Sequence, residues 1–391
     1  VIWWSNHPGN SKEAEQKIIA AFQLANPGIT VDLQDGGKNY EELAQKFNGA
    51  LAGNAAQLPD VIVASDVTWF NFALNKQLAA VDDLMAAAGL KTDDYVDALY
   101  SDYLFNGKHY ALPFARSTPL FYYNAEMWKN AGLEDRGPKT WQEFKEWAPK
   151  LQATIGSDKI PIILADGTNY LDWYFQNMAW NFGGAFSKEW TPTASDPKTI
   201  EAGKFLQELV AMKVVKFSKT PEADFQAGIA ACMLQSTGAL GGTTKNSKFA
   251  FKTAFLPGDG NCPTGGAGVA IPAGISEDRK KSAIKFVEFL TNTANTVLFT
   301  QATGYMPVRK SALDDAGEKA FLDKNPNSKV AVEQLAKTRS QDNARVLVQG
   351  GGARIGKSLD QVAAGQDVAS VFAALDKETQ GVIDAQIKPK L

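Results

Sequence analysis

The segment most suggestive of chemistry lies near the end of the chain, where residues 351–358 read GGARIGKS. These residues match the phosphate-binding P-loop pattern G-x-x-x-x-G-K-[ST]. In a P-loop NTPase the loop joins the first strand of a sheet to a helix, and a later strand supplies the carboxylate that holds magnesium. The chain ends at Leu391, and its last residues predict helices without such a strand. We therefore predict a glycine-rich loop that caps an ordinary helix starting near Lys357 and Ser358.

Other patterns typical of catalysis are missing from the sequence. There is no G-x-S-x-G nucleophile elbow and no H-E-x-x-H zinc motif. Two histidines, His7 and His109, are too few for a histidine-rich zinc site, and neither Cys232 nor Cys262 has a histidine motif nearby to activate it. No pair of carboxylates stands out for glycoside hydrolysis among the 43 acidic residues. We expect no catalytic residue, no metal and no cofactor.

Composition indicates a globular protein. The 391 residues, 45% of them hydrophobic and 21% charged, suggest two or three domains with ample core. The net charge of −3, with both signs interspersed, gives no basic surface for nucleic acid or for an acidic membrane. No apolar run reaches the roughly 18–20 residues that a membrane helix needs. The nine Trp and ten Tyr residues suit a pocket that stacks on a ligand.

The first part of the chain alternates strands and helices. Apolar runs predict strands at 1–4, 29–33 and 60–64, and periodic apolar residues predict helices at 13–26 and 40–51. This alternation favours a parallel α/β sheet.

The rest of the chain predicts a second α/β region and a helical end. Further strands are predicted at 108–114, 117–124, 160–164, 228–234, 249–255 and 269–272. Further helices are predicted at 141–153, 172–182, 200–212 and 277–293, and over most of the chain after Met306. The connections near Ala115 and Gly266 look like strands and not like flexible linkers, which is typical of two lobes joined by a hinge. The two cysteines could form a disulfide, lie as a pair of buried thiols, or be unrelated.

Several segments together carry a resemblance to a known family. They are the opening strand with Trp4, NPGITV at 26–31, GKNYEELAQKF at 37–47, PDVIVASD at 59–66, LPFARSTPLFYYN at 112–124, AGLEDRGPKTWQEF at 131–144, GGAG at 265–268 and ATGYMPVRKSA at 302–312. The chain resembles the extracytoplasmic solute-binding proteins of ABC importers, in the maltose-binding group. Its likeness is closest to the branch that binds sn-glycerol-3-phosphate and glycerophosphodiesters.

The resemblance implies an α/β, two-lobed periplasmic-binding-protein fold of type II. The first lobe would hold residues 1–114 and 267–302, and the second would hold 115–266 and 303–391. The ligand would lie between the lobes at the carboxyl ends of strands, and hinge closure would bury it for delivery to the membrane permease. A monomer that binds a small molecule and no nucleic acid is expected, either periplasmic or anchored outside the cytoplasmic membrane.

The resemblance also implies ligand-binding roles for ten residues. They are Tyr40, Asp66, Arg116, Ser117, Trp173, Ser236, Thr237, Gly266, Tyr305 and Arg354. Tyr40 would donate its hydroxyl, unless it packs on the surface at a helix start. Asp66 would accept glycerol hydroxyls where related proteins carry a glutamate, unless it caps a helix. Arg116 would add a cation where related proteins carry a small polar residue, unless it is a surface arginine.

The remaining predicted residues favour an anion. Trp173 would stack on the ligand, with Tyr170 as the nearby alternative and helix packing as the competing role. Hydroxyl groups at Ser117, Ser236, Thr237 and Tyr305 and the bare amide of Gly266 would donate to a phosphate. Arg354 would bind the phosphate directly, with Arg345 as a rival.

Three alternatives compete with a binding protein for glycerol phosphates. A related protein could bind a neutral or another anionic carbohydrate. A P-loop NTPase would bind ATP in the presence of magnesium, and it would lose this binding in Lys357→Ala. A secreted hydrolase would turn its ligand over, and we expect retention without turnover.

Overall fold

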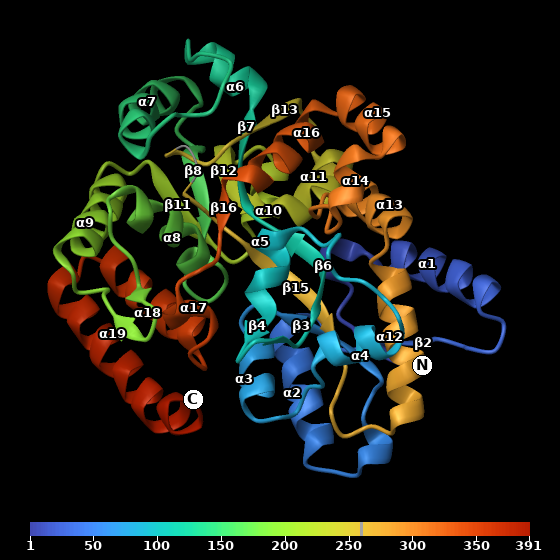
Figure 1. Ribbon diagram of the computed structural model, residues 1–391. Helices are drawn as coiled ribbons and strands as arrows, with labels where there is room; N and C mark the ends of the chain where they lie inside the picture. The colour runs from blue at the N-terminus through green and yellow to red at the C-terminus, as the bar shows by residue number, and fades with distance from the viewer. Residues whose placement is uncertain (259–260) are drawn as a thin grey trace. The chain divides into compact units, whose positions relative to one another are not determined.

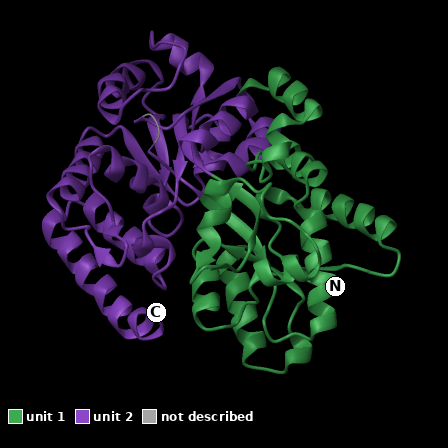
Figure 2. Ribbon diagram, in the orientation of Figure 1, with its two compact units in different colours: residues 1–117, 265–326 green, residues 118–264, 327–391 purple. Residues whose placement is uncertain are grey.

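The structure is a computed structural model that describes residues 1–258 and 261–391. The chain divides into two compact units, which Figure 2 draws in different colours. Unit 1 consists of Val1–Ser117 and Gly265–Pro326, and unit 2 consists of Thr118–Thr264 and Asn327–Leu391. Each unit contains helices and a five-stranded sheet, so the predicted α/β class is confirmed.

The main sheet of unit 1 has the strand order β2-β1-β3-β15-β6 (Figure 1). β1 is parallel to β2 and β3, as the alternation predicted, whereas β15 is antiparallel to both β3 and β6. The strands of unit 1 are β1 (Ile2–Ser5), β2 (Asp32–Asp35), β3 (Val61–Ser65), β4 (Leu104–Phe105), β5 (Lys108–His109), β6 (Leu112–Ser117) and β15 (Gly265–Ala270). Its helices are α1 (Lys12–Ala25), α2 (Tyr40–Leu51), α3 (Trp69–Leu74), α4 (Val81–Ala87), α5 (Asp97–Tyr100), α12 (Glu277–Leu290), α13 (Thr293–Thr303), α14 (Lys310–Asp314) and α15 (Ala316–Lys324).

Local sequence explains where the early helices start and what they bury. α1 buries Ala14, Ile18 and Phe22, which are one helical turn apart. α2 begins at Tyr40 because the side chain of Asn39 caps it and accepts a hydrogen bond from the backbone N–H of Glu42 at 2.8 Å.

One edge of the unit 1 sheet collects the ends of four strands. β1, β2, β3 and β6 all run in the same direction, because β15 is antiparallel to both of its neighbours. Their carboxyl ends therefore lie at the edge where β15 begins with Gly265. We call it the unit 1 edge, and it is where ligands are bound in open α/β sheets.

The main sheet of unit 2 has the strand order β11-β8-β12-β7-β13. β8, β11 and β12 are parallel, and β7 is antiparallel to β12 and β13. The strands of unit 2 are β7 (Pro119–Asn124), β8 (Ile160–Ala165), β9 (Ser187–Lys188), β10 (Thr191–Pro192), β11 (Val215–Ser218), β12 (Ala230–Ser236), β13 (Phe251–Ala254), β14 (Cys262–Pro263) and β16 (Thr338–Arg339). The carboxyl ends of the three parallel strands, Ala165, Ser218 and Ser236, define the unit 2 edge.

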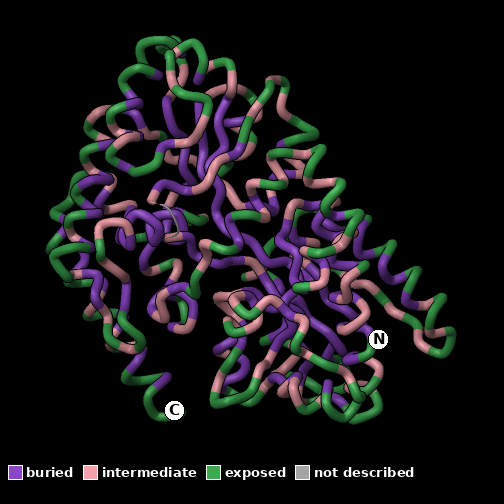
Figure 3. The backbone as a smooth tube through the Cα atoms, turned by 45° about the horizontal axis from the view of Figure 1, so that its top comes forward, coloured by how far each residue is buried: buried purple, intermediate pink, exposed green. Residues whose placement is uncertain are grey.

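The helices of unit 2 enclose a large apolar core. They are α6 (Ala125–Asn130), α7 (Trp141–Thr154), α8 (Leu171–Asn181), α9 (Pro197–Ala211), α10 (Pro221–Gln226), α11 (Leu240–Asn246), α16 (Pro326–Glu333), α17 (Asn343–Val346), α18 (Gly351–Ala363) and α19 (Val368–Val382). α8 is buried on every side from Leu171 to Trp180, which is typical of a helix at the centre of a core. Figure 3 shows the contrast between buried strands and half-exposed outer helices. Within the described ranges, no helix has the length and apolarity required to cross a bilayer.

Residues 303–326 were expected in the second lobe, but they pack in unit 1. Backbone hydrogen bonds explain the difference. The N–H of Met306 donates to the carbonyl of Arg116 at 2.7 Å, and the N–H of Val96 donates to the carbonyl of Val308 at 3.0 Å.

The cysteines are two free, buried thiols, so they do not form a disulfide. Cys232 lies on β12 and Cys262 on β14, both within the core of unit 2. Burial raises the pKa of each thiol far above its ordinary value, which makes both cysteines poor nucleophiles.

Candidate functional site

Unit 1 brings three of the predicted residues into contact at the unit 1 edge. The backbone N–H of Asp66, directly after β3, donates to the carbonyl of Gly266 at 2.9 Å. Gly266 is in turn paired with Arg116 across β15 and β6. Residues from three separate stretches of sequence thus meet at one end of the sheet.

Gly266 occupies a position that only glycine fits. Its φ of +91° lies in the left-handed region, and a Cβ atom built there would come within 2.0 Å of the carbonyl oxygen of Ala115. The sheet also changes register between Ala267 and Gly268. Ala267 pairs with Ala115 and Gly268 with Pro113, so the extra residue of this bulge is Phe114 on β6.

Arg116 is a buried residue and not a surface arginine. Its side chain is 0% exposed, and its guanidinium donates to the carboxylate of Asp102 and, at 2.9 Å, to the hydroxyl of Tyr103. Burial acts to lower the pKa of Arg116, but Tyr103, Asp102 and Asp66 outweigh it and hold the pKa above its usual value. The cation is therefore already balanced by two carboxylates within unit 1.

Three more of the predicted residues belong to unit 1. Tyr40 is the first residue of α2, which follows β2 at the unit 1 edge. Ser117 is the last residue of β6, pairs with Gly265 and is 2% exposed. Tyr305 follows α13, is 7% exposed, and stacks on Phe299 with ring centroids 5.8 Å apart.

In unit 2, Ser236 and Thr237 lie at the carboxyl end of β12. The hydroxyl of Ser236 accepts a hydrogen bond from the N–H of Gly238 at 3.1 Å. Thr237 is 0% exposed, and its Oγ1 makes no hydrogen bond within the described residues. Buried hydroxyls normally have a partner, so the lack of one at Thr237 is unusual.

Trp173 lies on α8 next to a buried ion pair. Its indole N–H donates to the carbonyl of Thr264 at 2.9 Å, and its ring contacts Tyr170 and Tyr174. The neighbouring Asp172 accepts a hydrogen bond from Nε of Arg345 at 2.6 Å. Burial raises the pKa of Asp172, and Arg345 opposes that rise.

The two candidate arginines lie in different surroundings. Arg345 is 5% exposed and engaged by Asp172 and Gln341. Arg354 lies on the first turn of α18, is half-buried, and donates from one nitrogen to the carbonyl of Gln349 at 2.9 Å. Its other terminal nitrogen, Nη1, is buried without a hydrogen bond among the described residues. Burial lowers the pKa of Arg354, and Glu378 acts in the opposite direction. Arg345 thus pairs with Asp172, the residue before Trp173, whereas Arg354 has a nitrogen without a hydrogen bond among the described residues.

The P-loop match is explained by helix packing. Residues 351–358 form the first turns of α18, and the preceding apolar run includes α17 and not a strand. The predicted loop with a helix starting near Lys357 is therefore wrong. A Cβ atom at Gly351 would lie 2.1 Å from the carbonyl oxygen of Ala344, and one at Gly356 would lie 2.0 Å from that of Gly167. The glycines let α18 approach neighbouring backbone.

Sequence reasoning missed the residues that hold the predicted ones in place. Asp102 and Tyr103 orient Arg116, while Asp172 orients Arg345. In unit 2 the Oε1 atom of Gln235 accepts both the hydroxyl of Tyr174 at 2.9 Å and the N–H of Ser236 at 2.8 Å. No local pattern marks these residues, since each contacts a partner that is distant in the sequence.

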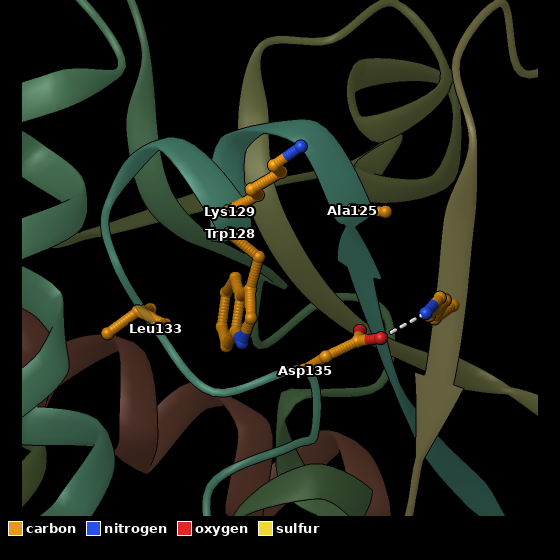
Figure 4. Close-up of a pocket in the computed structure, with 6 residues that line it drawn as sticks. Ala125, Trp128, Lys129, Leu133 and Asp135 are labelled. Atoms are coloured by element: carbon orange, nitrogen blue, oxygen red, sulfur yellow. Dashed lines mark hydrogen bonds and ion pairs between the residues drawn. The ribbon is translucent and has the colours of Figure 1, made fainter.

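A surface pocket of about 290 Å³ lies elsewhere in unit 2 (Figure 4). Asp135, which Figure 4 labels, forms an ion pair with Lys252, and both residues line the pocket. Its lining residues are Ala125, Trp128, Lys129, Leu133, Asp135 and Lys252. None of the ten predicted residues lines it. In the described part of the chain, no group of three or more metal-binding side chains is present.

A buried carboxylate near Arg345 predicts a pH-dependent stability. Asp342 accepts hydrogen bonds from the N–H of Phe186 at 2.7 Å and from the indole of Trp180 at 3.1 Å, yet burial raises its pKa to about 6. The folded protein then binds this proton more tightly than the unfolded chain, so its contribution to stability is greatest at low pH and is lost as pH rises from about 4 to about 6. We compare the unfolding free energies of Asp342→Asn and wild type. Between pH 4 and pH 7 their difference should shift by about 2 kcal/mol in favour of the variant.

Urea denaturation across this pH range measures the difference. Asp367 provides a control of opposite sign, because hydrogen bonds from Ser370 at a helix cap lower its pKa. Asp367→Asn should lose stability relative to wild type as pH rises through the acidic range. A wild-type pH profile in Asp342→Asn would contradict the prediction.

The fold and the two sheet edges define a class of protein, the solute-binding proteins. The model of the bacterial extracellular solute-binding protein family matches residues 17–329, and the chain belongs to this family. The predicted membership is confirmed, and it places the protein outside the cytoplasm.

Among the relatives, the particular likeness is to UgpB. The chain is 47% identical to UgpB from Mycobacterium tuberculosis, crystallised in complex with glycerophosphocholine, with a TM-score of 0.95 over 99% of both chains. It is 26% identical over 360 residues to the sn-glycerol-3-phosphate-binding periplasmic protein UgpB of Escherichia coli K12, covering 86% of this chain and 80% of that protein. The GacH receptor of Streptomyces glaucescens shares the fold, with a TM-score of 0.83 at 21% identity over 98% of both chains.

Proposed function

We propose that the protein binds sn-glycerol-3-phosphate or a glycerophosphodiester such as glycerophosphocholine, and delivers it to the permease of an ABC importer. The observation that carries this proposal is the 47% identity to a UgpB crystallised with glycerophosphocholine, over 99% of both chains. We propose the ten predicted residues as its ligand contacts. We also propose that the protein is a monomer without a nucleic-acid partner, and that it retains its ligand without turnover.

The chemistry at the two edges supports an anionic ligand with hydroxyl groups. Asp66 offers a carboxylate for glycerol hydroxyls at the unit 1 edge. Thr237 and Arg354 each hold a buried polar atom without a hydrogen-bond partner among the described residues. A phosphate oxygen would satisfy both kinds of donor, whereas a neutral sugar offers no charge to an arginine.

Calorimetric titration tests the proposal directly. We expect sn-glycerol-3-phosphate or glycerophosphocholine to bind, and maltose not to bind. Incubation with glycerophosphocholine should leave it chemically intact by mass spectrometry. Binding of maltose alone would favour the carbohydrate alternative, and cleavage of the diester would favour a hydrolase.

The arginine assignment gives a further prediction. Arg354→Ala should weaken binding of the phosphate ligand by about 2 kcal/mol, the scale of a buried charge-assisted hydrogen bond. Arg345→Lys serves as the matched variant, because it keeps a cation beside Asp172 but removes the planar fork. Wild-type affinity in Arg354→Ala together with weak binding in Arg345→Lys would overturn the assignment and make Arg345 the anion-binding arginine.

A further inference from the structure

The loop between β1 and α1 lies at the unit 1 edge, and no prediction included its residues. β1 ends at Ser5, and in the sheet it lies between β2 and β3. The chain after β2 leads to Tyr40, and the chain after β3 begins with Asp66. The backbone N–H of Gly36, directly after β2, donates to the carbonyl of Ser5 at 2.7 Å. Residues 6–11 therefore leave the sheet between the two segments that lead to Tyr40 and Asp66.

A buried carboxylate holds this loop. Glu15, in the first turn of α1, is 0% exposed. Its Oε1 accepts hydrogen bonds from the hydroxyls of Ser5 at 2.7 Å and Ser11 at 2.9 Å, and its Oε2 lies 2.5 Å from Nδ1 of His7. The backbone N–H of His7 also donates to the hydroxyl of Ser5 at 3.0 Å. Glu15 thus fixes one side of the His7 imidazole.

The other side of the imidazole has no partner. Nε2 of His7 is buried and makes no hydrogen bond among the described residues, and the same holds for Oδ1 of the neighbouring Asn6. Buried polar atoms normally have a partner in the protein or in bound solvent. Two consecutive residues therefore each leave a polar atom unsatisfied, at the edge of an α/β sheet where ligands are bound.

The backbone of the loop supports a functional role. His7 and Asn10 have φ angles of +50° and +58°, in the left-handed region that residues with a side chain seldom adopt. Such residues persist only where their surroundings hold them, and they gather at ligand-binding sites. For His7 the hydrogen bonds to Glu15 and Ser5 supply that restraint, so the imidazole is kept in one orientation.

A hydroxyl group is the ligand that suits both unsatisfied atoms. Because Nδ1 of His7 faces a carboxylate, it carries a hydrogen, and Nε2 is then either a donor or a bare acceptor. A hydroxyl can accept from the first form or donate to the second, and it can donate to the amide oxygen of Asn6. An ionised phosphate oxygen can only accept, so the amide oxygen of Asn6 and the carboxylate of Glu15 disfavour a phosphate here.

We propose that Asn6 and His7 form a subsite that binds a glycerol hydroxyl of the ligand, with Glu15 as the residue that positions His7. Both unsatisfied atoms are enclosed in this structure, so binding displaces part of the loop. This inference rests on the proposed function and deepens it, because it adds a hydroxyl-binding role to the ligand contacts at the unit 1 edge. The phosphate is left to other residues.

Ligands that lack one hydroxyl test the proposal by calorimetric titration. The parent ligands are sn-glycerol-3-phosphate and glycerophosphocholine. Each is compared with two analogues in which propane-1,3-diol or propane-1,2-diol replaces glycerol, so that the hydroxyl of the middle or of the terminal carbon is missing.

The test variant is His7→Asn. The asparagine amide keeps a donor for Glu15 and tolerates a positive φ, but it has no atom at the position of Nε2. His109→Asn is the matched control. Nδ1 of His109 also faces a carboxylate, that of Asp82 at 3.0 Å, but His109 on β5 comes before the start of β6, at the end of the sheet opposite to the unit 1 edge.

We expect His7→Asn to fold normally by thermal denaturation and to weaken binding of the parent ligand about tenfold. For one of the two analogues the substitution should change affinity less than about twofold, because that analogue lacks the hydroxyl that His7 binds. Asn6→Ala should show the same dependence on the same hydroxyl. It carries the comparison if His7→Asn is unstable, since it removes an oxygen without a partner among the described residues. His109→Asn should leave every affinity unchanged.

Two results would overturn the inference while leaving the proposed function intact. One is unchanged binding in both His7→Asn and Asn6→Ala. The other is an equal loss for the parent ligand and both analogues, which would show that the loop acts only through the shape of the unit 1 edge. If the wild-type protein binds neither parent ligand, the proposed function itself is overturned.

Discussion

Replacement of Arg345 by alanine is expected to lower the free energy of unfolding by about 3–5 kcal/mol, because it leaves a buried carboxylate without its cation. Asp172 is 2% exposed and Arg345 is 5% exposed, with 2.6 Å between the carboxylate and Nε. The pair connects α8 to α17, which lie far apart in sequence. Urea denaturation at neutral pH measures the loss.

The double variant Asp172→Ala and Arg345→Ala separates the charge effect from the loss of packing. It should recover part of the stability lost in Arg345→Ala, since no unpaired charge remains. An exposed pair on the same unit is the matched control. Lys198 and Glu201 lie 2.8 Å apart and are both exposed, so Lys198→Ala should cost less than about 1 kcal/mol. A cost below about 1 kcal/mol in Arg345→Ala would show that the buried pair is not needed for folding.

A single methyl group at Gly356 is expected to cost about 3 kcal/mol of folding stability. The added Cβ atom would lie 2.0 Å from the carbonyl oxygen of Gly167, and a Cβ at Gly167 would meet the carbonyl of Gly356 at 2.1 Å. Both obstacles are backbone, which cannot rotate away as a side chain would. The hydrogen bond from the N–H of Gly167 to Asp360 at 2.8 Å fixes the same contact.

Gly381 provides the opposite case on the neighbouring helix. It lies inside α19, and a Cβ atom there would meet nothing within 4 Å. Gly381→Ala should therefore stabilise the protein by about 0.5–1 kcal/mol through helix propensity alone. Thermal denaturation of both variants compares the two effects. A neutral Gly356→Ala variant would show that α18 can shift away from Gly167.

Elements with local signals could be predicted from the sequence. The start of α2 at Tyr40 follows from the cap at Asn39, and the start of α7 at Trp141 follows from the cap at Thr140, which accepts the N–H of Glu143 at 3.0 Å. The parallel order of β1, β2 and β3 follows from alternating strands and helices. In each case the deciding residues are neighbours in the chain.

What the sequence could not predict depends on contacts between distant segments. Residues 351–358 read as a loop because three glycines disfavour a helix, and the approach of Ala344 and Gly167 accounts for two of them, Gly351 and Gly356. The pairing of Arg345 with Asp172 and of Arg116 with Asp102 leaves no trace in local patterns. The ten candidate ligand residues came from a family resemblance, and physical reasoning from single residues would have missed most of them.

The insertion of β15 between β3 and β6 has a consequence for synthesis. Both strands lack their shared neighbour β15 until residues 265–270 have left the ribosome, because β15 pairs with each of them. A nascent chain that ends before Gly265 therefore presents two unpaired strand edges, which are templates for aggregation. No contiguous half of the gene encodes a complete unit, so a chaperone that delays folding until most of the chain is made would suit this topology.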